Sequence, residues 1–137
     1  MWNRDRIPYV LDSSLATRVQ DAVMNSIEEY HKHTCLRFRP KEASDDSYLR
    51  FKSGSGCSSA IGRRGGRQTI RLAPGCYRLI PAHEIFHALG RWHEQSRPDR
   101  DNFITINRDN IRAGSKRNFR KYGPNQADVQ GLSLIHI

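Results

Sequence analysis

The sequence predicts one α+β domain in which helices pack on a small sheet. Three observations carry this prediction. Short runs alternate apolar with basic residues, as strands with one buried face do. One longer stretch repeats apolar residues at helical spacing, and another places two histidines four residues apart, on one side of a helix. At 137 residues the chain can bury one core and is too short for two ordinary domains.

The composition indicates a soluble globular protein. Hydrophobic residues make up 36% of the chain and charged residues 27%. No apolar run approaches the roughly 20 residues that a membrane span requires, and Met1 leads directly into a polar segment, without a signal peptide. The three cysteines favour an oxidising compartment, and their odd number leaves at least one without an internal partner.

The first third of the chain predicts strands around a scaffold helix. Residues 7–11 are a β-prone run that ends at residues 12–14, Asp-Ser-Ser, any of which would cap a helix. An amphipathic helix follows, because apolar residues recur there at i, i+4 spacing. These residues are Leu15, Val19, Val23, Ile27 and Tyr30. Residues 36–39 and 48–51 then alternate apolar with basic side chains and are predicted strands.

The stretch from His83 to His93 predicts a zinc site at the end of a helix. With about 3.6 residues per turn, His83 and His87 lie on the same face of a helix, so both imidazoles reach one metal ion. Gly90 is where this helix can end, because glycine accepts the left-handed conformation that turns the chain back. His93 can then approach the same ion as a third ligand.

This arrangement indicates a catalytic zinc site. Three neutral imidazoles on Zn²⁺ leave a position open for water. Glu84 points about 100° away from the ligand pair, so we predict that it takes a proton from that water and does not bind the ion. The complete spacing, H-E-x-x-H-x-x-G-x-x-H, is the metzincin signature. A helix with unrelated surface histidines would explain neither Gly90 nor His93.

The residues after His93 extend the signature. Residues 94–101, Glu-Gln-Ser-Arg-Pro-Asp-Arg-Asp, resemble the astacin family of zinc endopeptidases, in which a glutamate follows the third histidine and an R-x-D-R-D run comes next. The resemblance extends from about Trp2 to about Gly131 and covers part of an astacin domain. It implies a metzincin-like N-terminal lobe: a twisted, mainly parallel sheet with an antiparallel edge strand, a scaffold helix and a zinc-binding active-site helix.

The resemblance stops after Gly131. We therefore expect residues 1–131 to form a partial astacin-like peptidase domain without its C-terminal lobe, and residues 132–137 to be an unrelated or artefactual tail. Astacins continue with a turn whose methionine packs beneath the zinc and whose tyrosine helps to stabilise the oxyanion. Because this sequence contains no such turn, the resemblance implies that the chain by itself cleaves poorly or not at all.

The resemblance also implies roles for residues outside the zinc helix. It pairs Cys57 with Cys76 and leaves Cys35 to a cysteine beyond this chain. Glu94 matches a buried glutamate that meets the amino group exposed when a pro-segment is removed. One further segment matches the edge strand of the family, which binds substrate in extended form by adding it to the sheet. Its residues are Ser58, Ser59, Ala60, Ile61 and Gly62.

The first functional hypothesis is a secreted zinc endopeptidase that hydrolyses internal peptide bonds of proteins. His83, His87 and His93 would hold one Zn²⁺, and the partners would be protein or peptide substrates, with no nucleic acid and no membrane span. Glu84 would act as the general base.

The formal charge of +9 leaves a second hypothesis open: a non-catalytic basic module that binds polyanions such as sulfated polysaccharide, with zinc structural or vestigial. Two clusters of basic residues favour it. They are Arg63, Arg64, Arg67 and Arg71, and Lys116, Arg117, Arg120 and Lys121. A solvated surface is the simpler explanation of both clusters, and no aromatic-interleaved nucleic-acid motif accompanies them.

Overall fold

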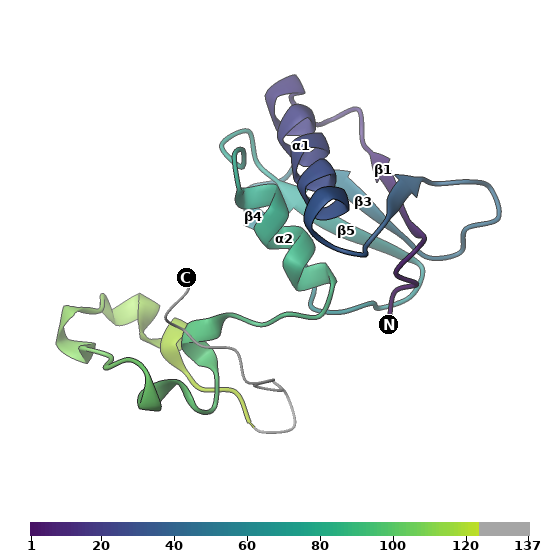
Figure 1. Ribbon diagram of the computed structural model, residues 1–137. Coiled ribbons are helices and arrows are strands. Elements are labelled where there is room, and N and C mark those ends of the chain that lie inside the picture. Colours follow the sequence, from purple (N-terminus) through teal and green to yellow (C-terminus); the bar gives the residue numbers. More distant parts are fainter. Residues whose placement is uncertain (124–137) are drawn as a thin grey trace. The chain divides into compact units, whose positions relative to one another are not determined.

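The computed structural model describes residues 1–123. The chain forms two compact units, Met1–Arg91 and a second that begins at Trp92. The first unit holds the sheet and both α-helices (Figure 1), and the second is built from short 3₁₀ helices. The expected domain end at residue 131 and the expected tail, residues 132–137, lie outside the described residues.

Five strands form one mixed sheet in the order β2-β1-β3-β5-β4. They are β1 (Ile7–Leu11), β2 (Phe38–Pro40), β3 (Tyr48–Lys52), β4 (Cys57–Ser58) and β5 (Arg67–Leu72). β1 pairs in parallel with β2 and β3, and β3 pairs in parallel with β5. β4 pairs antiparallel with β5 at the edge. This arrangement confirms the mainly parallel sheet with an antiparallel edge strand.

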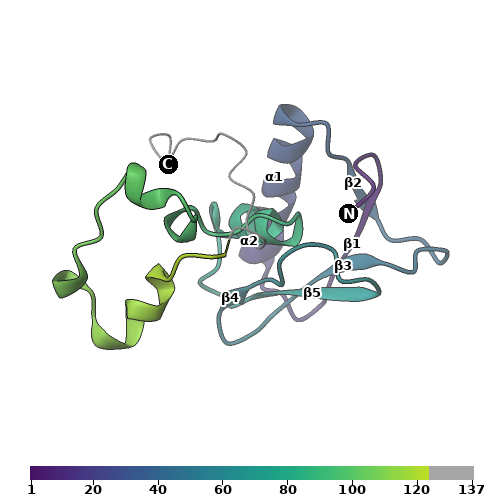
Figure 2. The ribbon, with the colours of Figure 1, turned by 90° about the horizontal axis from the view of Figure 1, so that it is seen from below.

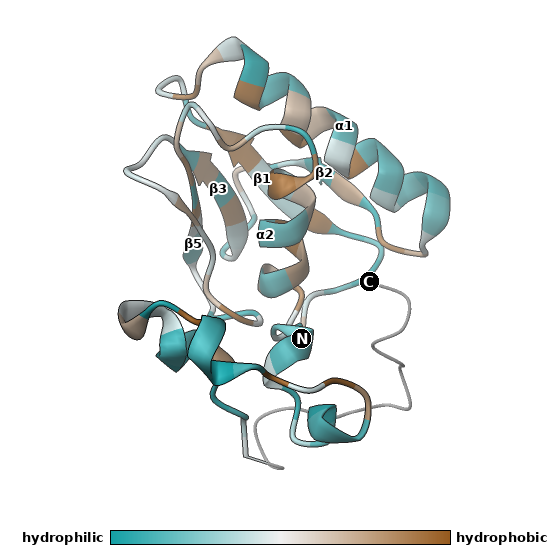
Figure 3. Ribbon diagram, turned by 90° about the vertical axis from the view of Figure 1, so that its left-hand side faces the viewer, coloured by the Kyte–Doolittle hydropathy of each residue, from teal (hydrophilic) through white to brown (hydrophobic). Residues whose placement is uncertain are grey.

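Both helices, α1 (Thr17–His33) and α2 (Ile80–Ala88), lie on the same side of the sheet (Figure 2). β5 alternates exposed and buried side chains, which directs one of its faces toward the core. In Figure 3, brown hydrophobic segments occur in β1 and alternate with teal ones in β3, whereas much of α1 is hydrophilic. Fully buried side chains fill the space between the layers: Ile7, Val19, Val23, Leu49, Phe51, Ile70 and Ile85.

The scaffold helix begins at Thr17, and none of the residues at 12–14 caps it. Its N-cap is Ala16, without a side-chain hydrogen bond. Asp12 instead accepts hydrogen bonds from the Ser14 backbone at 3.1 Å and from Arg50 Nε of β3 at 2.8 Å. Hydrogen bonds from Ser14 and Arg50 hold the pKa of the Asp12 carboxyl below its usual range. Asp12 therefore fastens the turn after β1 to β3 and is not available to the helix.

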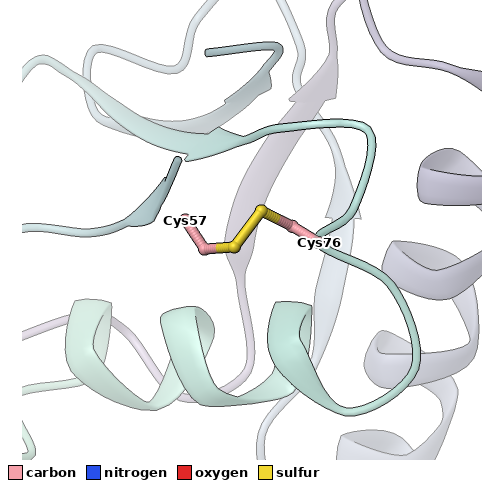
Figure 4. Close-up of a disulfide and its surroundings, with 2 residues drawn as sticks. All are labelled: Cys57 and Cys76. Carbon is pink, nitrogen blue, oxygen red and sulfur yellow. A yellow bond between two sulfur atoms is a disulfide. The ribbon is translucent and has the colours of Figure 1, made fainter. Parts of the chain in front are cut away.

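A disulfide joins Cys57 of β4 to Cys76 in the turn before α2 (Figure 4). This is the pair that the family resemblance implies. Cys76 is buried, whereas Cys35 is exposed and makes no disulfide. The bond ties the edge strand to the segment that leads into the helix carrying His83 and His87.

Removing this disulfide is expected to lower the free energy of unfolding by roughly 3 kcal/mol, because the bond limits the entropy of the unfolded chain. The two cysteines are 19 residues apart. Urea unfolding of the Cys57→Ser/Cys76→Ser variant would measure the loss, with Cys35→Ser as the control for replacing an exposed thiol. Equal unfolding midpoints for the two variants would contradict the prediction.

The sequence alone predicts a last helical stretch that Asn107 can cap and that extends through Arg120, but the described part of the second unit contains no α-helix there. The described part of this unit contains four 3₁₀ helices, of which the last two lie in the predicted stretch: Glu94–Ser96, Arg100–Asn102, Arg108–Asn110 and Ala113–Phe119. The last two contain no buried residue. An α-helix of this length depends on packing an apolar face, and this stretch buries none. The sequence prediction was therefore wrong here.

Candidate metal centre

Local sequence positions α2 against the sheet. Pro81 lies in the first turn of the helix, where its fixed φ suits helical geometry and its missing N–H costs no hydrogen bond. Ile85 and Ala88 are fully buried, while His83 is exposed. Because the apolar side of α2 faces the core, the helix presents His83 at the surface.

α2 ends in a tight turn at Gly90, where the sequence predicted its end. Gly90 has a φ of 106°. Its N–H donates to the carbonyl of His87 at 2.8 Å, and the N–H of Arg91 donates to the carbonyl of Phe86 at 3.1 Å. This pair of hydrogen bonds defines a Schellman motif. The chain therefore reverses direction just before His93.

A second glycine lies against this turn. Gly62, also at positive φ, donates its N–H to the carbonyl of His87 at 2.9 Å. A Cβ atom added to Gly62 or Gly90 would lie 3.9 Å from the Cα of the other glycine. The loop after β4 is thereby anchored to the C-terminal end of α2.

Replacing Gly90 by alanine is expected to destabilise the first unit by about 1–3 kcal/mol, because a residue with a Cβ is strained at this φ. Gly56→Ala is the matched control, since an added Cβ there meets nothing within 4 Å and the φ of Gly56 is not positive. Urea unfolding of both variants would compare them. If both unfolded at the wild-type midpoint, the role assigned to Gly90 would be wrong.

The structure brings the three predicted ligands together. The ring centroids of His83 and His87 are 4.5 Å apart. One ring nitrogen from each of His83, His87 and His93 lies within 4.8 Å of the others. Three imidazole nitrogens are a donor set that suits zinc, so the cluster is compatible with a zinc site.

A backbone hydrogen bond orients the middle ligand. His87 is buried, and its Nδ1 lies 2.8 Å from the carbonyl oxygen of Arg91. A carbonyl can only accept, so Nδ1 carries the proton and Nε2 keeps its lone pair for a metal. The turn at Gly90 supplies this carbonyl, and thus fixes the tautomer as well as the chain reversal.

Glu84 lies beside the histidines as a buried acid. It is 5% exposed, and its Oε2 atom accepts no hydrogen bond from any residue in the range 1–123. Burial raises the pKa of the Glu84 carboxyl, and the charges of His87 and His83 oppose this rise. A buried carboxylate oxygen without a partner is costly. Its position therefore fits a site that is completed by a further polar group.

The segment expected as an edge strand is mostly a loop. β4 comprises only Cys57–Ser58, so Ser58 is the one predicted residue that lies in the strand. Residues 59–62 have no strand hydrogen bonding to β5. The sequence prediction was thus wrong in the extent of the strand, although Ser58 does belong to β4, the outermost strand of the sheet.

A side chain takes the place of the missing backbone ladder. Gln68 of β5 is 4% exposed, and its Nε2 donates to the carbonyls of Ala60 at 3.2 Å and Gly62 at 3.0 Å. Its Oε1 accepts from the N–H of Arg64 at 3.0 Å. The sequence reasoning missed Gln68. The available signal was a polar residue two positions before Ile70, on the buried face of β5.

Glu94 forms an ion pair within the second unit. Its carboxylate is 3.0 Å from Arg97, and the Arg97 guanidinium also binds Asp99 at 2.9 Å. Arg97 is 5% exposed, so these pairs are largely shielded from water. The hydrogen bond from Arg97 lowers the pKa of Asp99. The family resemblance implied a different partner for Glu94, an amino group freed by processing.

The sequence and the fold match known proteins. The model of the Astacin peptidase family matches residues 1–134. Zinc metalloproteinase nas-15 of Caenorhabditis elegans is 44% identical over 124 residues, which cover 90% of this chain and 22% of that protein. Meprin A subunit beta of Homo sapiens is 41% identical over 124 residues, which cover 89% of this chain and 18% of that protein.

A solved structure agrees with these relatives. High choriolytic enzyme 1, a hatching enzyme zinc-protease from Oryzias latipes, matches with a TM-score of 0.78 and 35% identity, covering 86% of this chain and 60% of that chain. The chain thus spans 22% and 18% of the length of the two curated relatives above. The fold is that of the N-terminal lobe of a metzincin. With the family model matching nearly its whole length, the chain belongs to the astacin family.

Proposed function

We propose that the protein containing this chain is a zinc-dependent endopeptidase that hydrolyses internal peptide bonds of proteins. The observation that carries the proposal is the convergence of His83, His87 and His93 next to the buried Glu84. Relatives that are named zinc metalloproteinases support it. The disulfide between Cys57 and Cys76 supports an oxidising compartment, and hence a secreted protein.

No helix within residues 1–123 is long and apolar enough to cross a bilayer.

The roles of the site residues follow from their chemistry. His83, His87 and His93 would hold the metal, with the tautomer of His87 set by Arg91. Zn²⁺ bound there supplies a Lewis acid, which lowers the pKa of a water molecule and polarises a carbonyl. Glu84 accepts the proton of the attacking water and returns it to the leaving amine. Burial raises the pKa of Glu84 toward the range in which one carboxyl can both accept and donate a proton.

The loop after β4 is proposed to hold the substrate in extended form. β4 is the outermost strand of the sheet, where a peptide can add by backbone hydrogen bonds. Gln68 holds Ala60 and Gly62 from the sheet side. Gly62 is also bonded to the end of α2. The segment at residues 58–62 is thus fixed beside the helix that carries His83 and His87.

The test is cleavage of an internally quenched peptide by the full-length protein. We expect cleavage that o-phenanthroline abolishes and added Zn²⁺ restores. Binding of heparin without any cleavage, by protein loaded with zinc, would instead support the non-catalytic basic module.

A further inference from the structure

The sheet face that points away from α1 and α2 carries a group of basic side chains. Side chains alternate between the two faces of a strand, so the neighbours in sequence of the buried Leu49, Phe51 and Ile70 point away from the helices. The strand register places Lys52 opposite Arg71. The basic residues of this outer face on β3 and β5 are Arg50, Lys52, Arg67 and Arg71.

Most of this charge is not neutralised nearby. Arg50 binds Asp12, but Lys52, Arg67 and Arg71 are exposed and have no acidic partner within residues 1–123. The sequence explains why: seven lysine and arginine residues and no acidic residue lie between Asp46 and Glu84. A solvated surface normally intersperses both signs of charge. This face therefore presents a single-sign field, which attracts polyanions.

The three unpaired cations form a regular array. Arg67 and Arg71 lie on the same face of β5, four residues and so about 13 Å apart, and Lys52 lies on the next strand, about 5 Å to the side of Arg71. The stem of Arg71 is packed against Gly54, where an added Cβ would be 3.1 Å from the Arg71 Cβ. Cations placed at intervals on a rigid strand suit a linear chain of anionic groups that lies along β5.

We propose that this outer face, defined by Lys52, Arg67 and Arg71, binds a linear sulfated polysaccharide. The disulfide between Cys57 and Cys76 favours an extracellular setting, where such polymers are the abundant linear polyanions. The proposal is independent of peptidase activity.

Other polyanions fit this face less well. Single-stranded nucleic acid is held by open aromatic platforms, but the aromatic residue here, Tyr48, is half-buried and has Lys41 over its ring at 5.1 Å. Membrane surfaces are gripped by exposed apolar side chains together with basic ones. The large exposed hydrophobic residues within residues 1–123 all lie elsewhere: Met1, Met24, Leu79, Phe86 and Phe103.

The test compares two triple variants of the full-length protein for binding to heparin oligosaccharides of defined length. One is Lys52→Gln/Arg67→Gln/Arg71→Gln. We expect its affinity to fall at least about tenfold, and the slope of log affinity against log salt to shrink by about two, because three ionic contacts are lost. The control, Arg4→Gln/Lys32→Gln/Arg78→Gln, removes the same charge from exposed residues off this face and should bind nearly as the wild type does.

Three outcomes would overturn the proposal. If both triple variants lost heparin affinity equally, only the net charge of the protein would matter. If neither variant lost affinity, the outer face would not be the binding site. A single-stranded oligonucleotide or phosphatidylserine vesicles could also be added as competitors. If either competed as effectively as heparin at equal charge, the face would have no selectivity for a polysaccharide. Arg67→Lys/Arg71→Lys, which keeps the charge, should retain binding, and all variants should unfold at the wild-type temperature.

Discussion

Replacing His87 by alanine is expected to reduce bound zinc from about one ion per chain to almost none. His87 is buried, and its hydrogen bond to the carbonyl of Arg91 orients the imidazole. Losing a group that merely orients a ligand costs 10–100-fold in metal affinity, and the loss of a ligand should exceed about 100-fold. Metal analysis of the full-length protein after dialysis would measure it.

His33→Ala is the matched control for this experiment. His33 is an exposed histidine on α1, 3.1 Å from Glu29, and belongs to no metal cluster found in residues 1–123. This variant should keep its zinc. If wild type, His33→Ala and His87→Ala held equal amounts of zinc, the ligand assignment would be refuted.

Replacing Glu84 by glutamine is expected to leave zinc bound and to lower kcat by about 10²–10⁴, the usual contribution of a general base. Glutamine has nearly the same shape but cannot accept the proton. Because the pKa of Glu84 is raised by burial, wild-type turnover should also fall as the pH is lowered through that pKa and the base becomes protonated. Cleavage of a quenched peptide would be measured together with zinc content.

Glu28→Gln supplies the control for removing one carboxylate, because Glu28 is exposed on α1. It should cleave at the wild-type rate. Loss of zinc from Glu84→Gln would make Glu84 a ligand, and undiminished turnover would exclude it as the base.

Most of the first unit could be predicted because its elements bury one face. Residues 7–11 were predicted and observed as a strand, and the strand predicted at 48–51 is extended by one residue in β3. The apolar stripe of α1 predicted the helix. Its start at Thr17 could not be predicted, because the competing use of Asp12 depends on Arg50, which is distant in sequence.

The candidate site also combines features that the local sequence predicts with features that depend on distant residues. The spacing of His83 and His87 and the turn at Gly90 follow from helix geometry within a few residues, and they were predictable. The approach of Gly62 to Gly90 and the amide of Gln68 beneath the edge loop depend on tertiary packing. They leave no periodic signal in the sequence.

The dependence on tertiary packing also explains why the helix predicted in the second unit is not observed. Between Asn107 and Arg120 the sequence contains many residues that are compatible with a helix, but helix formation there needs a surface on which to pack. The sequence does not show that η4 (Ala113–Phe119) buries no residue.

The central claim is that three histidines of this chain hold one zinc ion, and X-ray absorption at the zinc edge tests it most directly. The full-length protein loaded with one equivalent of Zn²⁺ should show scattering from three imidazoles at about 2.0–2.1 Å. The His93→Ala variant should show one imidazole fewer. A sulfur shell near about 2.3 Å, or an imidazole count unchanged in His93→Ala, would contradict the account.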